Sequence, residues 1–395
     1  MKQLKDNEKI PYGRQYIDER DIAAVKNILK SDFLTQGPQV ELFEKDISKK
    51  VSSKYAVAVN SATSALHISC LAVGLGKGDI LWTVPNSFVA SANCGLYCGA
   101  KVDFVDIDSK TWNISIESLK KKLLKAKKQK KLPKILIPVH LGGNPSNQQD
   151  IFELSKKYGF KIIEDASHSI GASNNGEPVG SCKWSDITIF SFHPVKIITT
   201  GEGGVATTND KYLFKRLNLF RTHGITKNKS DFISKDTKEW FYEQHELGFN
   251  YRMTDIQAAL GRSQLKKIDI FIKKRNQIAS RYYEFLSGLP LKFQKIDKKI
   301  ISSFHLFIIR LEEDVIISHE AFFKKLRNEG IMVNLHYIPI HLQPYYKQLG
   351  FKKGMFAESE NYAESAISIP IYPKLSLSKQ KFVSKSISKL LKNHG

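Results

Sequence analysis

The sequence has few cysteines, comparatively few acidic residues and no long uninterrupted apolar segment. Four cysteines stand among 395 residues, and none forms a Cys-x-x-Cys pair with a distant partner pair, as zinc sites usually do. We therefore expect small buried side chains and no bound metal. No apolar run reaches the roughly 18 residues of a membrane-spanning helix, and the N-terminal segment lacks an apolar signal core. These absences predict a cytoplasmic protein with no membrane partner.

Basic residues greatly outnumber acidic ones. Lys and Arg total 61 against 39 Asp and Glu, which gives a formal net charge of +22. Such an excess is typical of nucleic-acid-binding proteins. However, the lysines are spread along every segment, and no basic helix with interleaved aromatic residues occurs. The densest run, residues 120–131, falls between an expected helix and an expected strand, where a solvated face is the ordinary outcome. We expect no nucleic-acid partner, and a positive field that attracts an anionic substrate.

The length and the order of the expected elements predict an α/β protein with two domains. A chain of 395 residues exceeds one ordinary core. In the first half, apolar runs typical of strands alternate with patterns typical of helices, which favours a mainly parallel mixed sheet flanked by helices. We assign residues 1–262 to this larger domain and 263–395 to a smaller C-terminal α+β domain. The expected strands of the larger domain include residues 55–59, 80–84, 102–107, 135–139 and 160–164.

One lysine stands between an expected strand and a tight turn. Lys196 follows an apolar run that ends at Phe190 and precedes the Thr/Gly turn 199–204. Most lysines in such a place are solvated, but Asp165 ends another apolar strand upstream, and the ends of parallel strands share one edge of a sheet. An amine and a carboxylate in one crevice suit pyridoxal phosphate (PLP). The amine bonds to the aldehyde, and the acid keeps the ring nitrogen protonated so that the ring can accept electrons.

A strand, turn and helix near the N-terminus supply a candidate phosphate site. Strand 55–59 leads into a turn with small polar residues, and a helix follows. The backbone N–H groups and the dipole at a helix N-terminus bind phosphate without a lysine. Taken alone, the pattern is equally well explained by a serine or threonine N-cap, whereas the lysine and the acid downstream favour the cofactor site. The residues at this helix start are Ser61, Ala62 and Thr63.

Four segments together resemble a known protein family. They are Leu34 to Pro38, Asn60 to Leu66, Glu164 to His168 and Ser191 to Gly204. They look like the DegT/DnrJ/EryC1/StrS family of nucleotide-sugar aminotransferases, and the resemblance is weaker beyond Arg252. It implies fold type I of the PLP-dependent aminotransferases, with PLP as cofactor. The last of the four segments is most similar to the pseudaminic-acid subgroup.

The resemblance implies roles for further residues. It makes Lys196 and Asp165 the catalytic pair and places Phe88 against the cofactor ring, although an aromatic residue in this position is often core. It implies that His168 donates to the phenolic oxygen of the cofactor, where many members have glutamine. Asn250 is implied to reach the phosphate of a partner subunit's cofactor, so the active sites would be shared within a homodimer.

Other contacts are expected at the cofactor phosphate and at the substrate. We expect the Ser191 hydroxyl to bind the phosphate, with capping of a strand end as the alternative. Tyr12, in an entrance loop, is a candidate substrate contact or a surface residue. The resemblance places the loop with Thr35 and Gly37 at the sugar site. A loop after a C-terminal strand is expected to close over the nucleotide sugar. It contains His336 and Tyr337.

These residues predict a transamination in two half-reactions. By resemblance, glutamate donates an amino group, and the acceptor is the 4-keto group of a UDP-linked 4-keto-6-deoxy-N-acetylhexosamine in pseudaminic acid or related surface-glycan biosynthesis. Other nucleotide-linked 3-keto or 4-keto sugars, carried by dTDP or GDP, remain open. A related sugar dehydratase, with histidine in place of the lysine, is disfavoured by Lys196. A non-enzymatic regulator or nucleic-acid-binding protein is the alternative from a different class, and it would lack the cofactor's colour.

Overall fold

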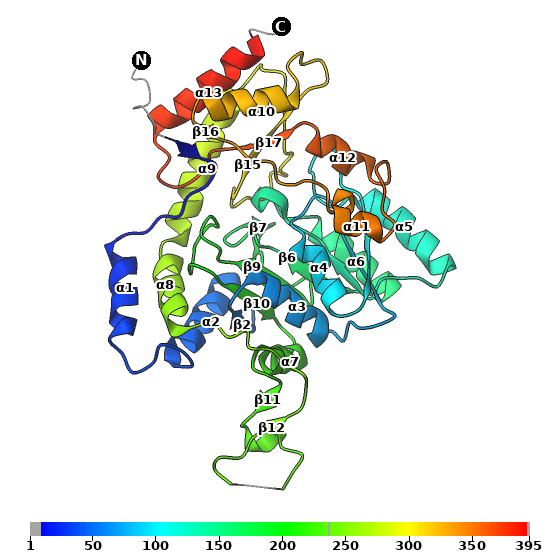
Figure 1. Ribbon diagram of the computed structural model, residues 1–395, viewed down its shortest axis with the longest axis vertical. Helices are drawn as coiled ribbons and strands as arrows, with labels where there is room; N and C mark the ends of the chain where they lie inside the picture. Colours follow the sequence, from blue (N-terminus) through cyan, green and yellow to red (C-terminus); the bar gives the residue numbers. More distant parts are fainter. Residues whose placement is uncertain (1–8, 236–237, 393–395) are drawn as a thin grey trace.

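A seven-stranded sheet forms the centre of the molecule in the computed structural model, which describes residues 9–235 and 238–392 (Figure 1). The strand order is β2-β10-β9-β6-β5-β3-β4. Strands β9, β6, β5, β3 and β4 run parallel, whereas β10 is antiparallel to both β2 and β9. The predicted mainly parallel mixed sheet is confirmed. The strands are β2 (Tyr55–Val59), β3 (Ile80–Thr83), β4 (Lys101–Phe104), β5 (Ile135–Ile137), β6 (Lys161–Asp165), β9 (Ile187–Ser191) and β10 (Gly204–Thr208).

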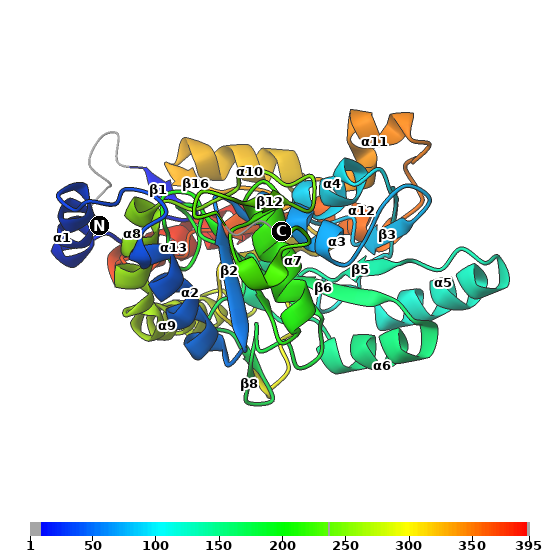
Figure 2. The ribbon, with the colours of Figure 1, turned by 90° about the horizontal axis from the view of Figure 1, so that it is seen from below.

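Helices cover both faces of this sheet because successive side chains of a strand point to opposite faces. In β2, Val57 and Val59 pack under α3, whereas Ala56 and Ala58 pack with α2. Figure 2 shows α3 on one side of β6, and α5 and α6 on the other. The helices on the first face are α3 (Ala62–Ala72), α4 (Ala90–Tyr97) and α7 (Lys211–Arg221). Those on the second are α2 (Pro38–Val51), α5 (Ile116–Lys128), α6 (Gln148–Tyr158), α8 (Asp255–Leu265) and the first half of α9 (Ile268–Phe285).

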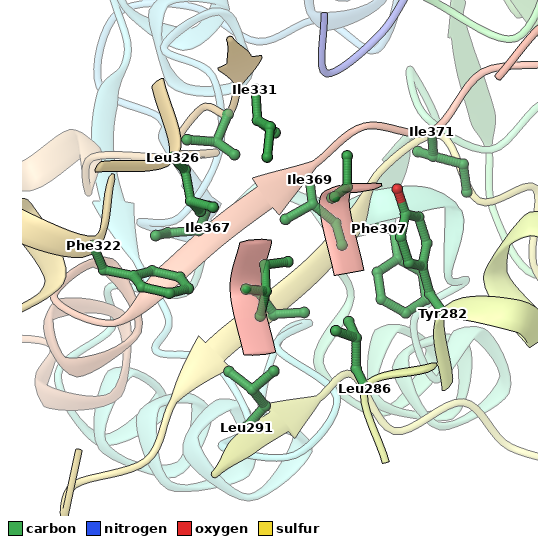
Figure 3. Close-up of a cluster of buried hydrophobic side chains, with 14 of the residues drawn as sticks. Tyr282, Leu286, Leu291, Phe307, Phe322, Leu326, Ile331, Ile367, Ile369 and Ile371 are labelled. Atoms are coloured by element: carbon green, nitrogen blue, oxygen red, sulfur yellow. The ribbon is translucent and has the colours of Figure 1, made fainter. Parts of the chain in front are cut away.

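The C-terminal part has its own sheet and its own core. Strand β15 (Phe307–Leu311) lies between β13 (Leu291–Phe293) and β17 (Ala366–Ile369), and all three are antiparallel. Figure 3 shows the side chains of this core, in which strand residues Phe307, Ile367 and Ile369 pack with helix residues Phe322 and Tyr282. The helices that cover it are the second half of α9, α10 (His319–Asn328) and α13 (Leu377–Lys392). The predicted α+β character of this part is confirmed.

The first residues that the structure describes lie against the C-terminal part. Strand β1 (Ile10–Pro11) pairs in parallel with β16 (Ile331–Met332), and Ile10 belongs to the C-terminal core. The backbone carbonyl of Tyr12 accepts a hydrogen bond of 2.9 Å from the N–H of Ile371. This hydrogen bond holds Tyr12 against the C-terminal part, at the edge of the cavity described below. The boundary between residues 262 and 263 stays a prediction.

The remaining elements are short and connect these layers. Strands β11 and β12 form a ribbon that projects from the body beside α7 (Figure 1). Helix α1 begins after Asp18, because Asp18 caps it and Asp21 completes a capping box. In the described part of the chain, no helix is both long and apolar enough to cross a membrane. The elements are α1 (Glu19–Leu29), β7 (Ser173–Asn174), β8 (Glu177–Pro178), β11 (Ile225–Thr226), β12 (Glu243–Gln244), β14 (Ile300–Ile301), α11 (Pro344–Gln348), α12 (Ala357–Ala363) and the 3-10 turns η1 (Leu141–Gly143), η2 (Lys229–Asp231) and η3 (Ile340–Leu342).

Candidate active site

A cavity of about 940 Å³ lies where the parallel strands end and the C-terminal part begins. Strand β6 delivers one wall, the loop after β9 a second, and the start of α3 a third. The sequence-predicted residues that line this cavity are Tyr12, Ser61, Ala62, Thr63, Phe88, Asp165, His168, Ser191, Lys196, His336 and Tyr337. The fold therefore brings together residues that are far apart in the sequence.

Lys196 contributes an amine that is largely shielded from water. Burial lowers the pKa of Lys196 to about 8, and the negative charge of Asp165 offsets only part of that shift. Because an amine must lose its proton to act as a nucleophile, this shift makes Lys196 reactive near neutral pH. The loop that carries it is closed at both ends, since the N–H of Phe192 donates to the carbonyl of Gly203 at 2.9 Å. Gly201 turns this loop with a φ of 82°, which only glycine adopts without steric cost.

Asp165 ends β6 and presents a carboxylate that is held from two sides. Its Oδ2 accepts a hydrogen bond of 2.6 Å from the Ser91 hydroxyl, and its Oδ1 accepts one of 3.1 Å from the backbone N–H of Ser167. The side chain lines the cavity and is only 6% exposed. A buried carboxylate with fixed orientation can pair with a protonated ring nitrogen. The sequence did not predict the contribution of Ser91, which lies in the first turn of α4.

His168 lies in the cavity with its tautomer set by the backbone. The N–H of Gly142 donates to Nδ1 at 3.3 Å, so the proton of the neutral ring is on Nε2. Burial and the nearby positive charge of Lys196 hold the pKa of His168 well below its usual range. Nε2 lies 3.1 Å from the Tyr337 hydroxyl. The ring is thus a neutral N–H donor, the form that the predicted contact with a phenolic oxygen requires, and that contact stays a prediction.

The C-terminal part closes the cavity with uncharged rings. Nδ1 of His336 lies 2.8 Å from the Ser368 hydroxyl, and burial together with Lys196 lowers the pKa of His336 to about 3. The rings of Tyr12 and His336 have centroids 4.9 Å apart. His305, which the sequence did not predict, also lines the cavity, with its ring centroid 4.4 Å from that of His168. No local sequence pattern marks His305 as a cavity residue.

The start of α3 forms a cradle of backbone N–H groups. Ser61 is the N-cap, since its hydroxyl accepts from the N–H of Ser64 at 3.1 Å, so the capping explanation is correct and coexists with the cavity position. The first N–H groups of a helix have no acceptor within the helix, and here they line the cavity beside Ser191. A Cβ on Gly204 would lie 2.6 Å from the backbone of Ser61 and Ala62. Glycine at this position therefore keeps the cradle open.

These observations fit pyridoxal phosphate. The amine, the carboxylate and the N–H cradle lie around one cavity, as the amine, ring nitrogen and phosphate of that cofactor require. Phe88 also lines it and is 57% exposed, so it is not part of the core and leaves a ring face available.

Three predicted residues lie outside the cavity of their own chain. The N–H of Gly37 donates to Oδ2 of Asp255 at 2.8 Å, and Thr35 pairs with Thr254 across a β-bridge. These contacts fix the 34–38 loop against the start of α8. Asn250 is exposed and pairs with Thr222, which leaves its side chain accessible to another molecule. The roles assigned to Thr35, Gly37 and Asn250 stay predictions.

Comparisons with known proteins agree with the resemblance of the four segments. The model of the DegT/DnrJ/EryC1/StrS aminotransferase family matches residues 15–388. A UDP-4-amino-4,6-dideoxy-N-acetyl-beta-L-altrosamine transaminase of Campylobacter jejuni is 38% identical over 383 residues, which cover 97% of each chain.

Solved structures give the same result. Helicobacter pylori PseC, an aminotransferase involved in the biosynthesis of pseudaminic acid, superposes with a TM-score of 0.90 at 30% identity, over 98% of this chain and all of that one. Spr1654 of Streptococcus pneumoniae, named as a sugar aminotransferase and solved in a PLP-form, gives a TM-score of 0.87 at 26% identity, over 98% of this chain and 100% of that chain.

Proposed function

The chain belongs to the DegT/DnrJ/EryC1/StrS aminotransferase family, and from this premise we propose that it aminates the 4-keto group of a UDP-linked 4-keto-6-deoxy-N-acetylhexosamine. It is a PLP-dependent aminotransferase. One observation carries the proposal: Lys196 and Asp165, from two strand ends, line a single cavity with the cradle at α3. The similarity to the Campylobacter transaminase supports the choice of sugar. Glutamate is the proposed donor, and the product would enter pseudaminic acid or a related surface-glycan sugar.

Four residues would hold the ring of the cofactor. Lys196 would bond to its aldehyde carbon, Asp165 would pair with the ring nitrogen, and Phe88 would lie against the ring. The single N–H of His168, which faces the Tyr337 oxygen at 3.1 Å in this structure, would be shared between that oxygen and the phenolic oxygen. When bound, PLP acts as an electron sink for the electrons that a departing Cα proton leaves behind.

Lys196 then moves the proton. Its amine takes the Cα proton of the amino donor, and in the second half-reaction it acts in the reverse sense on the sugar carbon that receives nitrogen. A pKa of about 8 suits this exchange, because both protonation states are populated near neutral pH. Asp165 keeps its charge facing the ring nitrogen throughout. The uncharged rings of His336 and Tyr337 occlude water on the side of the C-terminal part.

We also propose a homodimer in which Asn250 reaches the cofactor phosphate of the partner subunit. The segment with β11 and β12 exposes large apolar side chains, since Ile233 is 86%, Trp240 78% and Leu247 82% exposed. Exposed apolar groups of this size are typical of surfaces that another chain covers. The proposed site of action is the cytoplasm, where glutamate and nucleotide sugars are both available.

A defined assay tests the substrate. Purified protein with PLP and glutamate is incubated with UDP-, dTDP- and GDP-linked 3-keto and 4-keto sugars, and the amino sugar is identified by mass and NMR. Protein stripped of cofactor is the control. We expect a 4-amino product from the UDP-linked N-acetylhexosamine. Turnover of a dTDP- or GDP-linked sugar alone would favour the alternative of another nucleotide sugar, and absence of any amino product would contradict the proposal.

A further inference from the structure

Two serines to which the proposed function gives no role lie directly behind Asp165. The Ser91 hydroxyl is 2.6 Å from Oδ2 of Asp165, and the Ser87 hydroxyl is 2.8 Å from that of Ser91. Ser91 is 0% and Ser87 3% exposed. Ser91 is therefore closed to water and supplies the side-chain hydrogen bond at Oδ2, whereas Ser87 also lines the cavity.

The direction of both hydrogen bonds follows from the charge on Asp165. An ionised carboxylate can only accept, so Ser91 donates its hydrogen to Asp165. The oxygen of Ser91 can then only accept from Ser87, which makes Ser87 the donor of the second bond. Hydrogen bonds arranged in one direction strengthen one another, and those to a charged acceptor are the strongest. The chain of donors ends at the carboxylate.

The two serines belong to the same turn as the ring-facing aromatic residue. Ser87 and Ser91 are four residues apart at the start of α4, and the N–H of Ser91 donates to the carbonyl of Phe88 at 3.2 Å. The positive end of the helix dipole also lies here and favours a negative charge. One turn of backbone therefore fixes both the ring face of Phe88 and the orientation of Asp165.

We infer that Ser91, supported by Ser87, is a positioning residue for aminotransfer that holds the Asp165 carboxylate in its orientation toward the cavity. This inference rests on the proposed function, because Asp165 must face the ring nitrogen of PLP for the contact to matter. Each donor to a carboxylate lowers its affinity for a proton. Loss of the Ser91 hydroxyl would move the shared proton from the ring nitrogen toward Asp165, and the electron sink would weaken.

Three variants of the full-length holoenzyme separate this role from general packing. Ser91→Ala deletes the donor, and Ser91→Thr restores it. Ser69→Ala is the matched control, because Ser69 is also 0% exposed and its hydroxyl has no hydrogen-bond partner among the residues that the structure describes. In the half-reaction with glutamate, we expect kcat to fall about tenfold or more in Ser91→Ala, with a smaller change in KM. Ser91→Thr should recover most of the rate, and Ser69→Ala should match the wild type.

A titration without any substrate gives the second readout. The absorbance of the Lys196-bound cofactor is followed against pH, and its midpoint should rise in Ser91→Ala, since a less positive ring nitrogen raises the proton affinity of the Lys196 nitrogen. Ser87→Ala should raise it by less. If Ser91→Ala does not fold, Ser87→Ala decides. An unchanged midpoint and rate in a folded, cofactor-loaded variant overturns the inference.

The same titration keeps this inference separate from the choice of sugar. A wild-type protein with the cofactor band that aminates none of the keto sugars contradicts the proposed substrate alone, and the Ser91 titration still decides. A wild-type protein that never develops the band contradicts both.

Discussion

The hydroxyl of Tyr337 lies 3.1 Å from Nε2 of His168, and this contact links the C-terminal part to the loop after β6. Because the N–H of Gly142 donates to the other ring nitrogen, His168 donates to the Tyr337 oxygen and leaves the Tyr337 hydrogen free for the cavity. Neutral His168 cannot return a proton to a deprotonated Tyr337, because loss of its Nε2 proton would leave the imidazole ring negatively charged. Tyr337 is therefore suited to donate a hydrogen bond to a substrate oxygen and not to transfer a proton.

Tyr337→Phe removes this donor and also the oxygen that accepts from the N–H of His168. We expect kcat with the keto sugar to fall about tenfold, as for the loss of one hydrogen bond to a reacting group, while the melting temperature changes little. Single-turnover kinetics of the two half-reactions measure this. Tyr345→Phe is the control, because Tyr345 is 58% exposed and does not line the cavity. Equal rates for Tyr337→Phe and Tyr345→Phe would show that the Tyr337 hydroxyl contacts no reacting atom.

The shifted pKa of Lys196 predicts how fast the cofactor-free protein binds PLP. Burial lowers this pKa to about 8, and only the neutral amine attacks an aldehyde. The rate should rise about tenfold per pH unit below 8 and level off above it, whereas an unshifted lysine would level off near pH 10. Stopped-flow absorbance between pH 6.5 and 9.5 measures the profile. Lys196→Ala should show no covalent binding and no turnover, and a profile still rising at pH 9.5 would contradict the burial of the amine.

Gly204→Ala tests the cradle at the start of α3. The added Cβ would lie 2.6 Å from the backbone of Ser61 and Ala62, so those N–H groups must move away from the phosphate site. We expect the Kd for PLP to rise about tenfold or more, as when one or two charge-assisted hydrogen bonds are lost. Fluorescence titration gives the Kd. Gly76→Ala is the matched control, since nothing lies within 4 Å of its added Cβ. Equal Kd values for the two variants would show that the cradle does not bind the phosphate of PLP.

The sequence predicted those parts of the site that local pattern determines. Asp165 ends one apolar strand and Lys196 follows another, and the ends of parallel strands share one edge of the sheet. The N-cap Asp18 was also predictable, because capping depends on residues within one turn.

The parts that it did not predict depend on contacts between distant segments. Ser91 matters only because α4 lies against the end of β6, and the hydroxyl itself resembles any other helical serine. The tautomer of His168 is set by the N–H of Gly142, which no side-chain pattern encodes. Strand β1 likewise joins the C-terminal core through the pairing of Ile10 with Ile331, and these two-residue strands are too short to give a sequence signal.

A buried ion pair between α1 and the chain after α8 gives a prediction on stability. Nζ of Lys267 lies 2.5 Å from Oδ2 of Asp21, which is 0% exposed, and 3.1 Å from Oδ1 of Asp18. Lys267→Ala leaves the Asp21 charge buried with hydrogen bonds from Ser263 and Gln264 but without a counter-ion. Such a loss costs about 3–5 kcal/mol of unfolding free energy.

Urea unfolding of the two neighbouring lysine variants tests this. Lys266 is exposed, so Lys266→Ala should change the unfolding free energy by no more than about 0.5 kcal/mol. Equal unfolding midpoints for Lys267→Ala and Lys266→Ala would mean that the ion pair does not hold α1 in place.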